Sequence, residues 1–181
     1  LIVMEDRDFY YHNGISIKST LRALIVDIIS LSTRQGASTV TQQLARNMYN
    51  TKGAKHYIGS DKHIMRKIKE FITAIKIEQA YTKSEILELY FNSVYFGHGN
   101  YGIQSASKYY FGKDVSELSL SDSAILIGLL PAPAKYSPFR YPERSIKRKK
   151  LVLKIMLEHG YISETEFNIA LSDKMPIKDS N

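Results

Sequence analysis

Two adjacent carboxylates, Glu5 and Asp6, are the first residues in the chain that could do chemistry. They follow an apolar run, and aromatic residues and His12 come directly after them in the stretch EDRDFYYHNG. A carboxylate against apolar and aromatic surface has its charged form disfavoured, which makes it a better general base near neutral pH. Composition alone favours the simpler interpretation, a surface pair at the start of a helix.

Polar side chains recur at helical spacing in the second stretch, QGASTVTQQLARN. Ser38, Gln42 and Arg46 stand four residues apart, so on a helix they would share one face, with apolar residues on the other. A row of donors that ends in a guanidinium suits sugar hydroxyls and phosphate oxygens. The alternative is an N-cap followed by a solvated face.

A third stretch, DKHIMRKIKE, places Lys62, Arg66 and Glu70 at the same spacing. Cations beside a carboxylate could bind a diphosphate, with or without a divalent ion. The alternative is a helix-surface ion pair worth a few tenths of a kcal/mol. The other side of this helix would carry an apolar stripe made of Ile64, Ile68, Phe71, Ile72 and Ile75.

Two further patterns favour structure over chemistry. Residues 85–113 are dense in aromatic residues and glycines, which stack on sugars or pack a core equally well. None of the five histidines pairs with another at a zinc-ligand spacing beside a carboxylate, so we do not expect a structural metal site. The basic stretch 144–150 fits a solvated helix face, with anionic lipid as the alternative.

The elements that must position these residues are helical almost throughout. Capping boxes predict three helix starts: Thr82 with Glu85, Ser119 with Asp122, and Ser163 with Glu166. Periodicity, glycines and prolines predict the helices 19–31, 38–49, 61–80, 83–97, 103–110, 119–130, 142–160 and a last short one after 163. Four of the five prolines predict an extended loop over 131–142.

Composition bounds the class of protein. The 181 residues carry 25 Lys+Arg against 18 Asp+Glu, a net charge of +7 that favours a polyanionic partner. The absence of cysteine excludes disulfides, thiolate metal sites and a cysteine nucleophile. No apolar run reaches the roughly 18 residues that span a bilayer. Because the chain opens at Leu1, we expect it to be a piece of a longer protein.

In their order, these stretches resemble the family 51 peptidoglycan glycosyltransferases, the transglycosylase domains of class A penicillin-binding proteins and the monofunctional transglycosylases. Five sequence blocks carry the resemblance, and they cover nearly the whole chain. They are Glu5-Asp6-x-x-Phe9-x-x-His12-x-Gly14, Gly36 to Asn47, Arg66-Lys67-x-x-Glu70, Lys83 to Lys113, and an apolar helix into Pro131, Pro133, Tyr136 and Pro138. Position 46 is Arg where the family usually has Lys, and Lys62 stands where some members carry Arg.

The resemblance implies a mainly α fold, a lysozyme-like helical domain with a small membrane-contacting jaw lobe. One glycosyltransferase domain would fill residues 1–181, with the lobe at roughly 15–35 and 47–60. The apolar segment 21–31 would then lie on the bilayer or serve as a core helix.

The same resemblance implies the site residues. Glu5 and Glu70 would be catalytic, with Glu5 as the general base. Glu70 would either hold a divalent cation, Mg²⁺ or Mn²⁺, or orient the cations around it; no other metal ligand and no organic cofactor are expected. The residues expected to bind substrate are Asp6, Phe9, Ser38, Thr39, Gln42, Gln43, Arg46, Asn47, Lys62, Arg66, Lys67, Glu88 and Asn92.

The implied activity is polymerisation of lipid II into glycan strands with release of undecaprenyl diphosphate. The implied partners are lipid II, the nascent glycan strand, an anionic membrane surface and a phosphoglycolipid inhibitor of the moenomycin type, with no nucleic acid. The implied location is the outer face of the bacterial plasma membrane, with the parent anchored by a transmembrane helix absent from this chain. Three alternatives stay open: a lysozyme-like glycan hydrolase, a basic helical module for nucleic acid, and an inactive scaffold domain.

Overall fold

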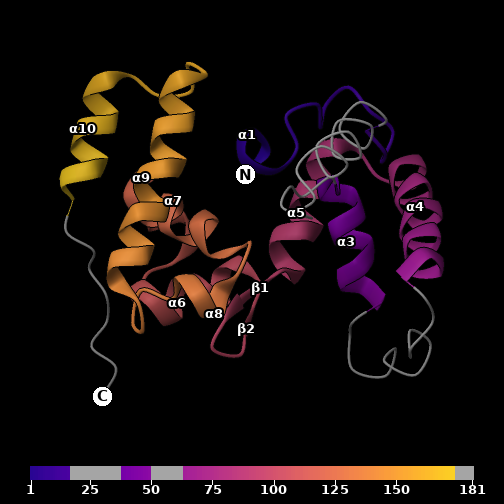
Figure 1. The fold of residues 1–181 in the computed structure, drawn as a ribbon, viewed down its shortest axis with the longest axis horizontal. Helices are drawn as coiled ribbons and strands as arrows, with labels where there is room; N and C mark the ends of the chain where they lie inside the picture. The colour runs from indigo at the N-terminus through magenta and orange to yellow at the C-terminus, as the bar shows by residue number, and fades with distance from the viewer. Residues whose placement is uncertain (17–37, 50–62, 174–181) are drawn as a thin grey trace, which may run out of the picture. The chain divides into compact units, whose positions relative to one another are not determined.

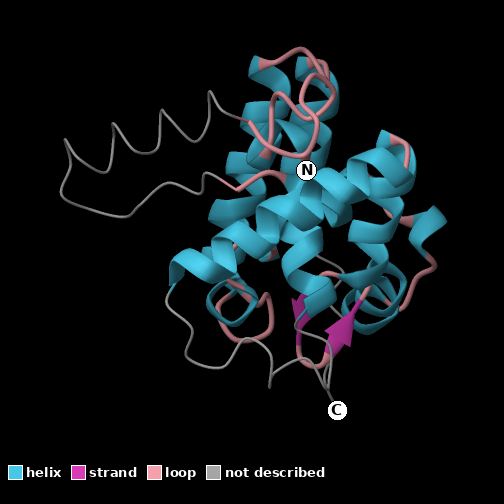
Figure 2. Ribbon diagram, turned by 90° about the vertical axis from the view of Figure 1, so that its right-hand side faces the viewer, coloured by secondary structure: helices cyan, strands magenta, loops and turns pink. Residues whose placement is uncertain are grey.

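Helices dominate the protein in a computed structural model, which describes residues 1–16, 38–49 and 63–173. Within those ranges, Figure 2 shows helices almost throughout and one small antiparallel sheet of two strands. The mainly helical fold predicted from the sequence is confirmed. The chain divides into two compact units, Leu1–Tyr90 and Phe91–Asn181.

The first unit is built on a pair of packed helices. Its elements are α1 (Ile2–Glu5), α3 (Val40–Tyr49), α4 (His63–Ala80) and α5 (Lys83–Ser93), the last of which runs on into the second unit. Figure 1 shows α3 lying beside α4, and the two helices pack directly on each other. Val40, Leu44 and Ala45 of α3 are buried, as are Ala74 and Ile77 of α4. Burial of a side chain such as Leu44 contributes about 1.5–3 kcal/mol.

The apolar stripe of α4 does not face this core. Ile68, Ile72 and Ile75 are 44%, 50% and 39% exposed, whereas Glu70 is 1% exposed. The ion pair given as the alternative is present, with Arg66 and Lys67, but the carboxylate of Glu70 is buried and does not lie at the surface. The inward face of α4 is set by its contact with α3, which requires the small Ala74 and a carboxylate that can pair with α3. The spacing of apolar residues predicts neither the need for a small residue nor the need for a buried carboxylate.

The second unit surrounds the apolar helix α7. Its elements are β1 (Tyr95–Gly97), β2 (Asn100–Tyr101), α6 (Ile103–Phe111), the 3₁₀ helix η2 (Val115–Glu117), α7 (Leu120–Leu129), α8 (Pro133–Tyr136), α9 (Pro142–Glu158) and α10 (Glu164–Ser172). Ile125, Leu126 and Leu129 of α7 are at most 1% exposed. A Cβ at Gly128 would lie 3.2 Å from the Cβ of Arg148, which shows how closely α7 approaches α9.

Lys149 of α9 is a buried cation that closes the end of α10. Its ammonium donates to the hydroxyl of Ser121 at 3.2 Å and to the carbonyls of Ala170 and Asp173 at 3.0 and 3.1 Å. The last carbonyls of a helix lack partners inside it, so this lysine supplies the donors that α10 needs. Burial lowers the pKa of Lys149.

Most helix predictions are confirmed in the described ranges, but the helix predicted over 83–97 ends at Ser93, because Tyr95–Gly97 pair as strand β1. The three predicted capping boxes start α5, α7 and α10. The proline-rich loop is not wholly extended, because Pro133 begins the single turn α8. The predicted helix 19–31 and nearly all of the predicted lobe, 15–35 and 47–60, lie outside the described residues. In the part of the chain that the structure describes, no helix is long and apolar enough to cross a membrane.

Candidate active site

Asp6 fixes the end of α1 to the start of α3. Its carboxylate side chain is buried and accepts from the backbone N–H of Val40 at 2.9 Å, so it caps a helix that begins 34 residues later. The same carboxylate lies 3.0 Å from Nε2 of His12. Because Gly14 donates its N–H to Nδ1 of that ring, Nε2 carries the proton and donates it to Asp6. Glu5, the neighbour of Asp6, is thereby held at a set place beside α3.

Thr39 and Gln42 form a capping box at the start of α3. The N–H of Gln42 donates to Oγ1 of Thr39 at 3.1 Å, and the N–H of Thr39 donates to Oε1 of Gln42 at 3.2 Å. The Thr39 hydroxyl also donates to the carbonyl of Gly14 at 2.6 Å. The two side chains are 2% and 1% exposed.

Four residues expected to bind substrate directly are therefore buried in the structure. Phe9 is fully buried, with the ammonium of Lys83 4.6 Å from its ring centre. Asp6, Thr39 and Gln42 spend their polar atoms on the protein itself, apart from Nε2 of Gln42, which is buried without a partner among the described residues. The structure therefore places these four behind the exposed face of the site, and their expected contact with substrate stays a prediction.

Gln43 links the carboxylate of Glu5 to α3. Its Nε2 donates to Oε2 of Glu5 at 3.2 Å, and its Oε1 accepts from the hydroxyl of Tyr90 at 3.0 Å. Glu5 and Gln43 are both partly exposed, so a ligand in solvent can reach them. Tyr90 is completely buried. Burial raises the pKa of Tyr90, and the negative charge of Glu5 raises it further, so this phenol stays protonated.

One turn along α3 from Gln43, Arg46 heads a cluster of cations around Glu70. Its Nε donates to Oε1 of Glu70 at 2.9 Å and its Nη2 donates to Oε2 at 3.2 Å, a two-pronged contact. The ammonium of Lys67 lies 3.1 Å from Oε2 of Glu70, and Nε of Arg66 lies 3.8 Å from Oε1. Arg46 and Lys67 both donate to the hydroxyl of Ser38, at 3.2 and 2.6 Å. Three cations around one carboxylate leave a net charge of +2.

These cations keep Glu70 ionised. Burial by itself opposes its ionisation, but hydrogen bonds and charge from Arg46 and Lys67 outweigh burial and hold the pKa of Glu70 below its ordinary value. The three cationic side chains are 34–38% exposed, so their outer faces are open to an anion.

The surroundings of Glu70 do not fit a divalent ion. Both of its oxygens already accept from cations, and a metal would have to displace them. In the described ranges no cluster of three histidine, aspartate or glutamate side chains could hold a metal. Of the two expectations for Glu70, the arrangement favours the one in which it orients the cations, and we derive no step through a metal.

The remaining residues predicted to bind substrate are Asn47, Glu88, Asn92 and Lys62. Asn47 follows Arg46 on α3 and is half-buried, whereas Glu88 and Asn92 are exposed on α5. Among the described residues, no hydrogen bond or ion pair joins these three to the cluster. Lys62 lies outside the described residues.

Lys83 supports the site through contacts that the sequence does not predict. Its ammonium donates to the carbonyl of His12 at 2.6 Å and to Glu78 at 2.8 Å, and Glu78 also accepts from the hydroxyl of Thr41. The lysine thus ties the start of α5 to α4 and to the loop after α1. No sequence pattern reveals this group of hydrogen bonds, because Lys83 lies 5 residues from Glu78 and 71 residues from His12.

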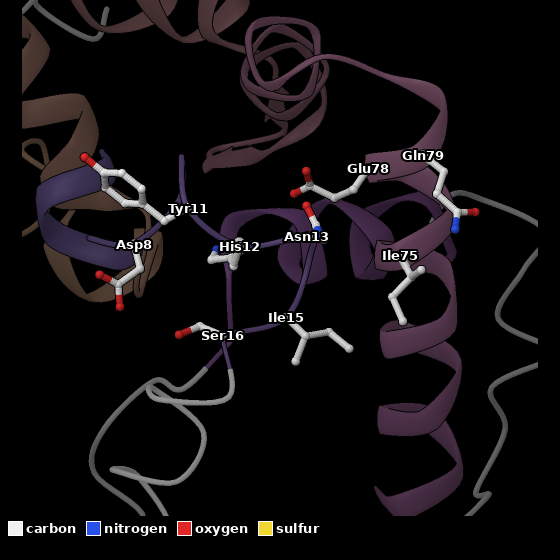
Figure 3. A pocket seen from close by; sticks show the side chains of 9 residues that line it. All are labelled: Asp8, Tyr11, His12, Asn13, Ile15, Ser16, Ile75, Glu78 and Gln79. Carbon is white, nitrogen blue, oxygen red and sulfur yellow. The ribbon is translucent and has the colours of Figure 1, made fainter.

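A pocket opens between that loop and α4, shown in Figure 3. Its lining consists of Asp8, Tyr11, His12, Asn13, Ile15, Ser16, Ile75, Glu78 and Gln79. Its charged members are the carboxylates of Asp8 and Glu78, and none of the residues predicted to be catalytic lines it. A diphosphate is therefore better matched to the cations around Glu70 than to this pocket.

Comparison with known proteins settles the family. The sequence pattern of the Transglycosylase family matches residues 1–157, which include the carboxylate at α1, the polar face of α3 and the cation cluster. The chain belongs to the transglycosylase family. The enzyme class expected from the sequence is thereby confirmed.

The similar proteins found by sequence comparison are penicillin-binding proteins. The chain is 44% identical to penicillin-binding protein 1A of Aquifex aeolicus over 99% of its length, and 45% identical to penicillin-binding protein 1F of Bacillus subtilis over 91%. It spans 24% and 22% of the length of these relatives. In a crystal structure of penicillin-binding protein 1A from Haemophilus influenzae, a region 42% identical superposes with a TM-score of 0.52, covering 53% of this chain and 14% of that one.

Proposed function

We propose that this transglycosylase polymerises lipid II into glycan strands by inverting transfer. The 4-hydroxyl of an acceptor GlcNAc attacks C1 of the donor MurNAc, so the C1–O4 bond forms as the bond from C1 to the diphosphate breaks. The acceptor proton goes to a base, and undecaprenyl diphosphate leaves. The observation that carries the proposal is that α3 presents the partner of Glu5 and the head of a cation cluster one turn apart, at Gln43 and Arg46.

Glu5 acts as the base. It is a partly exposed carboxylate with one oxygen held by the amide of Gln43, which suits proton transfer from a hydroxyl in solvent. A general base supplies typically about 10²–10⁴-fold in rate. The inverting course requires the base on the side of the sugar ring opposite the leaving group. Gln43, which holds Glu5, and Arg46, which heads the cation cluster, lie one turn apart on α3.

The leaving diphosphate needs positive charge where its negative charge develops. Arg46, Lys67 and Arg66 supply three cations, and Ser38 adds a hydroxyl that Arg46 and Lys67 hold in place. Preorganised charges of this kind lower the barrier because they need no reorientation during the reaction. Glu70 serves as the fixed counter-charge that aligns them. A hydrolase that only adds water to a glycan would have no use for this cluster.

The expected partners follow from the same chemistry. Lipid II, the growing glycan strand and a phosphoglycolipid inhibitor of the moenomycin type all present anionic phosphate linked to sugar, which the cluster around Glu70 matches. Such substrates are held in a membrane, so the domain works against an anionic surface at the outer face of the plasma membrane. The net charge of +7 supports that arrangement.

Glu5→Gln tests the base. We expect glycan polymer from labelled lipid II in detergent with the wild type and a loss of at least about 10²-fold with Glu5→Gln, because the amide cannot take a proton. Binding of a moenomycin-type phosphoglycolipid should persist in the variant. Glu143→Gln, at an exposed carboxylate on α9, is the matched control.

Three outcomes would count against the proposal. Substantial turnover by Glu5→Gln would remove Glu5 from the role of base. Release of soluble sugar fragments from preformed glycan would identify a hydrolase. A wild type that neither polymerises lipid II nor binds the phosphoglycolipid would remove the proposed activity altogether.

A further inference from the structure

The amide of Gln43 stands between two groups with different hydrogen-bonding needs. On one side the carboxylate of Glu5, when ionised, can only accept hydrogen bonds. On the other side the protonated phenol of Tyr90 donates to Oε1 of Gln43 at 3.0 Å. The NH₂ group of Gln43 then points to Oε2 of Glu5 at 3.2 Å and reaches the carbonyl of Ser38 at 3.5 Å.

An amide has two ends, and its orientation decides whether it helps or harms the base. A flipped Gln43 would set its carbonyl oxygen against the carboxylate of Glu5, two acceptors facing each other. Donation from Tyr90 to Oε1 stabilises the opposite orientation, in which an N–H meets the carboxylate. Because Tyr90 is fully buried and its pKa is raised, this donor is fixed in place and stays protonated.

We infer that Tyr90 is a positioning residue for the base: it sets the polarity of Gln43, which in turn holds Oε2 of Glu5 and leaves Oε1 to take the acceptor proton. The inference rests on the proposed role of Glu5. Tyr90 does not touch the substrate, and it acts through Gln43. No local pattern reveals the link, because Tyr90 and Gln43 lie 47 residues apart.

Tyr90→Phe is the direct test, since it removes one oxygen and keeps the ring in the core. We expect kcat for lipid II polymerisation to fall about tenfold with KM nearly unchanged, the effect of loosening one hydrogen bond to a charged group. The acidic limb of the pH profile of kcat should move to higher pH, because an amide free to flip stabilises the ionised carboxylate less.

Tyr110→Phe is the matched control. Tyr110 is also fully buried, and its hydroxyl donates to the carbonyl of Phe96 at 2.8 Å, far along the chain from Glu5. Its loss should lower the melting temperature by an amount comparable to that of Tyr90→Phe, without moving the pH profile. A common loss of stability is thereby separated from an effect on the base.

A double-mutant cycle with Gln43→Met shows whether Tyr90 acts through the amide. Methionine has a similar shape and no hydrogen-bonding amide, so Tyr90→Phe should cost nothing more in that background. An undiminished loss there would overturn the inference, as would a wild-type rate and pH profile in Tyr90→Phe. If the wild type did not polymerise lipid II, the proposed function would fail, and this inference with it; an active wild type beside an unaffected Tyr90→Phe would refute the inference alone.

Discussion

At the scale of single residues, Glu70 combines burial with full engagement by cations. It is 1% exposed and ionised, and it accepts from Arg46 and Lys67 with Arg66 nearby. Without the carboxylate of Glu70, the positive charge of Arg46 on α3 would face those of Arg66 and Lys67 on α4. Its first role is thus to make a cationic site compatible with a folded pair of helices.

Glu70→Gln should therefore lower the free energy of unfolding near neutral pH by about 1–3 kcal/mol. Because the pKa of Glu70 in the folded protein lies below its ordinary value of 4.5, its contribution is complete above that value and declines as the pH falls through the lowered pKa. Urea titrations of wild type and variant at decreasing pH check this. A difference that stayed constant into strong acid would contradict the assignment.

At the scale of elements, the start of α3 is the point on which the site depends. Its first N–H groups are bound by Asp6, which follows α1, and by the capping box of Thr39 and Gln42. Gln43 and Arg46 follow in the next two turns, so any shift of this helix end moves the base and the cations together.

Asp6→Ala should cost about 2–3 kcal/mol of stability, because it removes both a helix cap and the partner of His12. Activity should fall as well, although Asp6 is buried, because the helix that carries Gln43 and Arg46 would shift. Circular dichroism with urea, beside a polymerisation assay, measures both. Asp6→Asn retains an acceptor for Val40 and should recover part of the loss; equal damage from both variants would show that the charge toward His12 dominates.

Sequence signals predicted the elements well where the signal was local. The capping box of Thr82 with Glu85 involves residues only three apart, and the structure contains it. The T-x-x-Q pattern of Thr39 and Gln42 is equally local, and the structure has a capping box there as well. The buried face of α4 could not be predicted, because Glu70 is drawn inward by Arg46, 24 residues away. The contact of Tyr90 with Gln43 could not be predicted either, because the two residues lie 47 positions apart. Residue types suggest a site, but only tertiary contacts distinguish the residues that line it from those that support it.

At the scale of the whole molecule, the surplus of cations predicts a preference among membranes. We expect the protein to sediment with vesicles containing phosphatidylglycerol more than with vesicles of phosphatidylcholine alone, and to be released as salt is added. The exposed cations of α9, Arg144, Lys147, Lys150 and Lys154, contribute to that charge. Equal retention on both kinds of vesicle would show that net charge does not govern the association.

The placement of Gln43 and Arg46 on one helix also sets a scale for ligand design. Residues three apart on a helix have Cβ atoms about 5–6 Å from each other. A compact molecule, with an anionic group for the cations and an ammonium or hydroxyl for Glu5 beside Gln43, would need its two ends at a comparable spacing. The rigid backbone of α3 maintains that spacing, so a small rigid scaffold would suffice to place one group at each end.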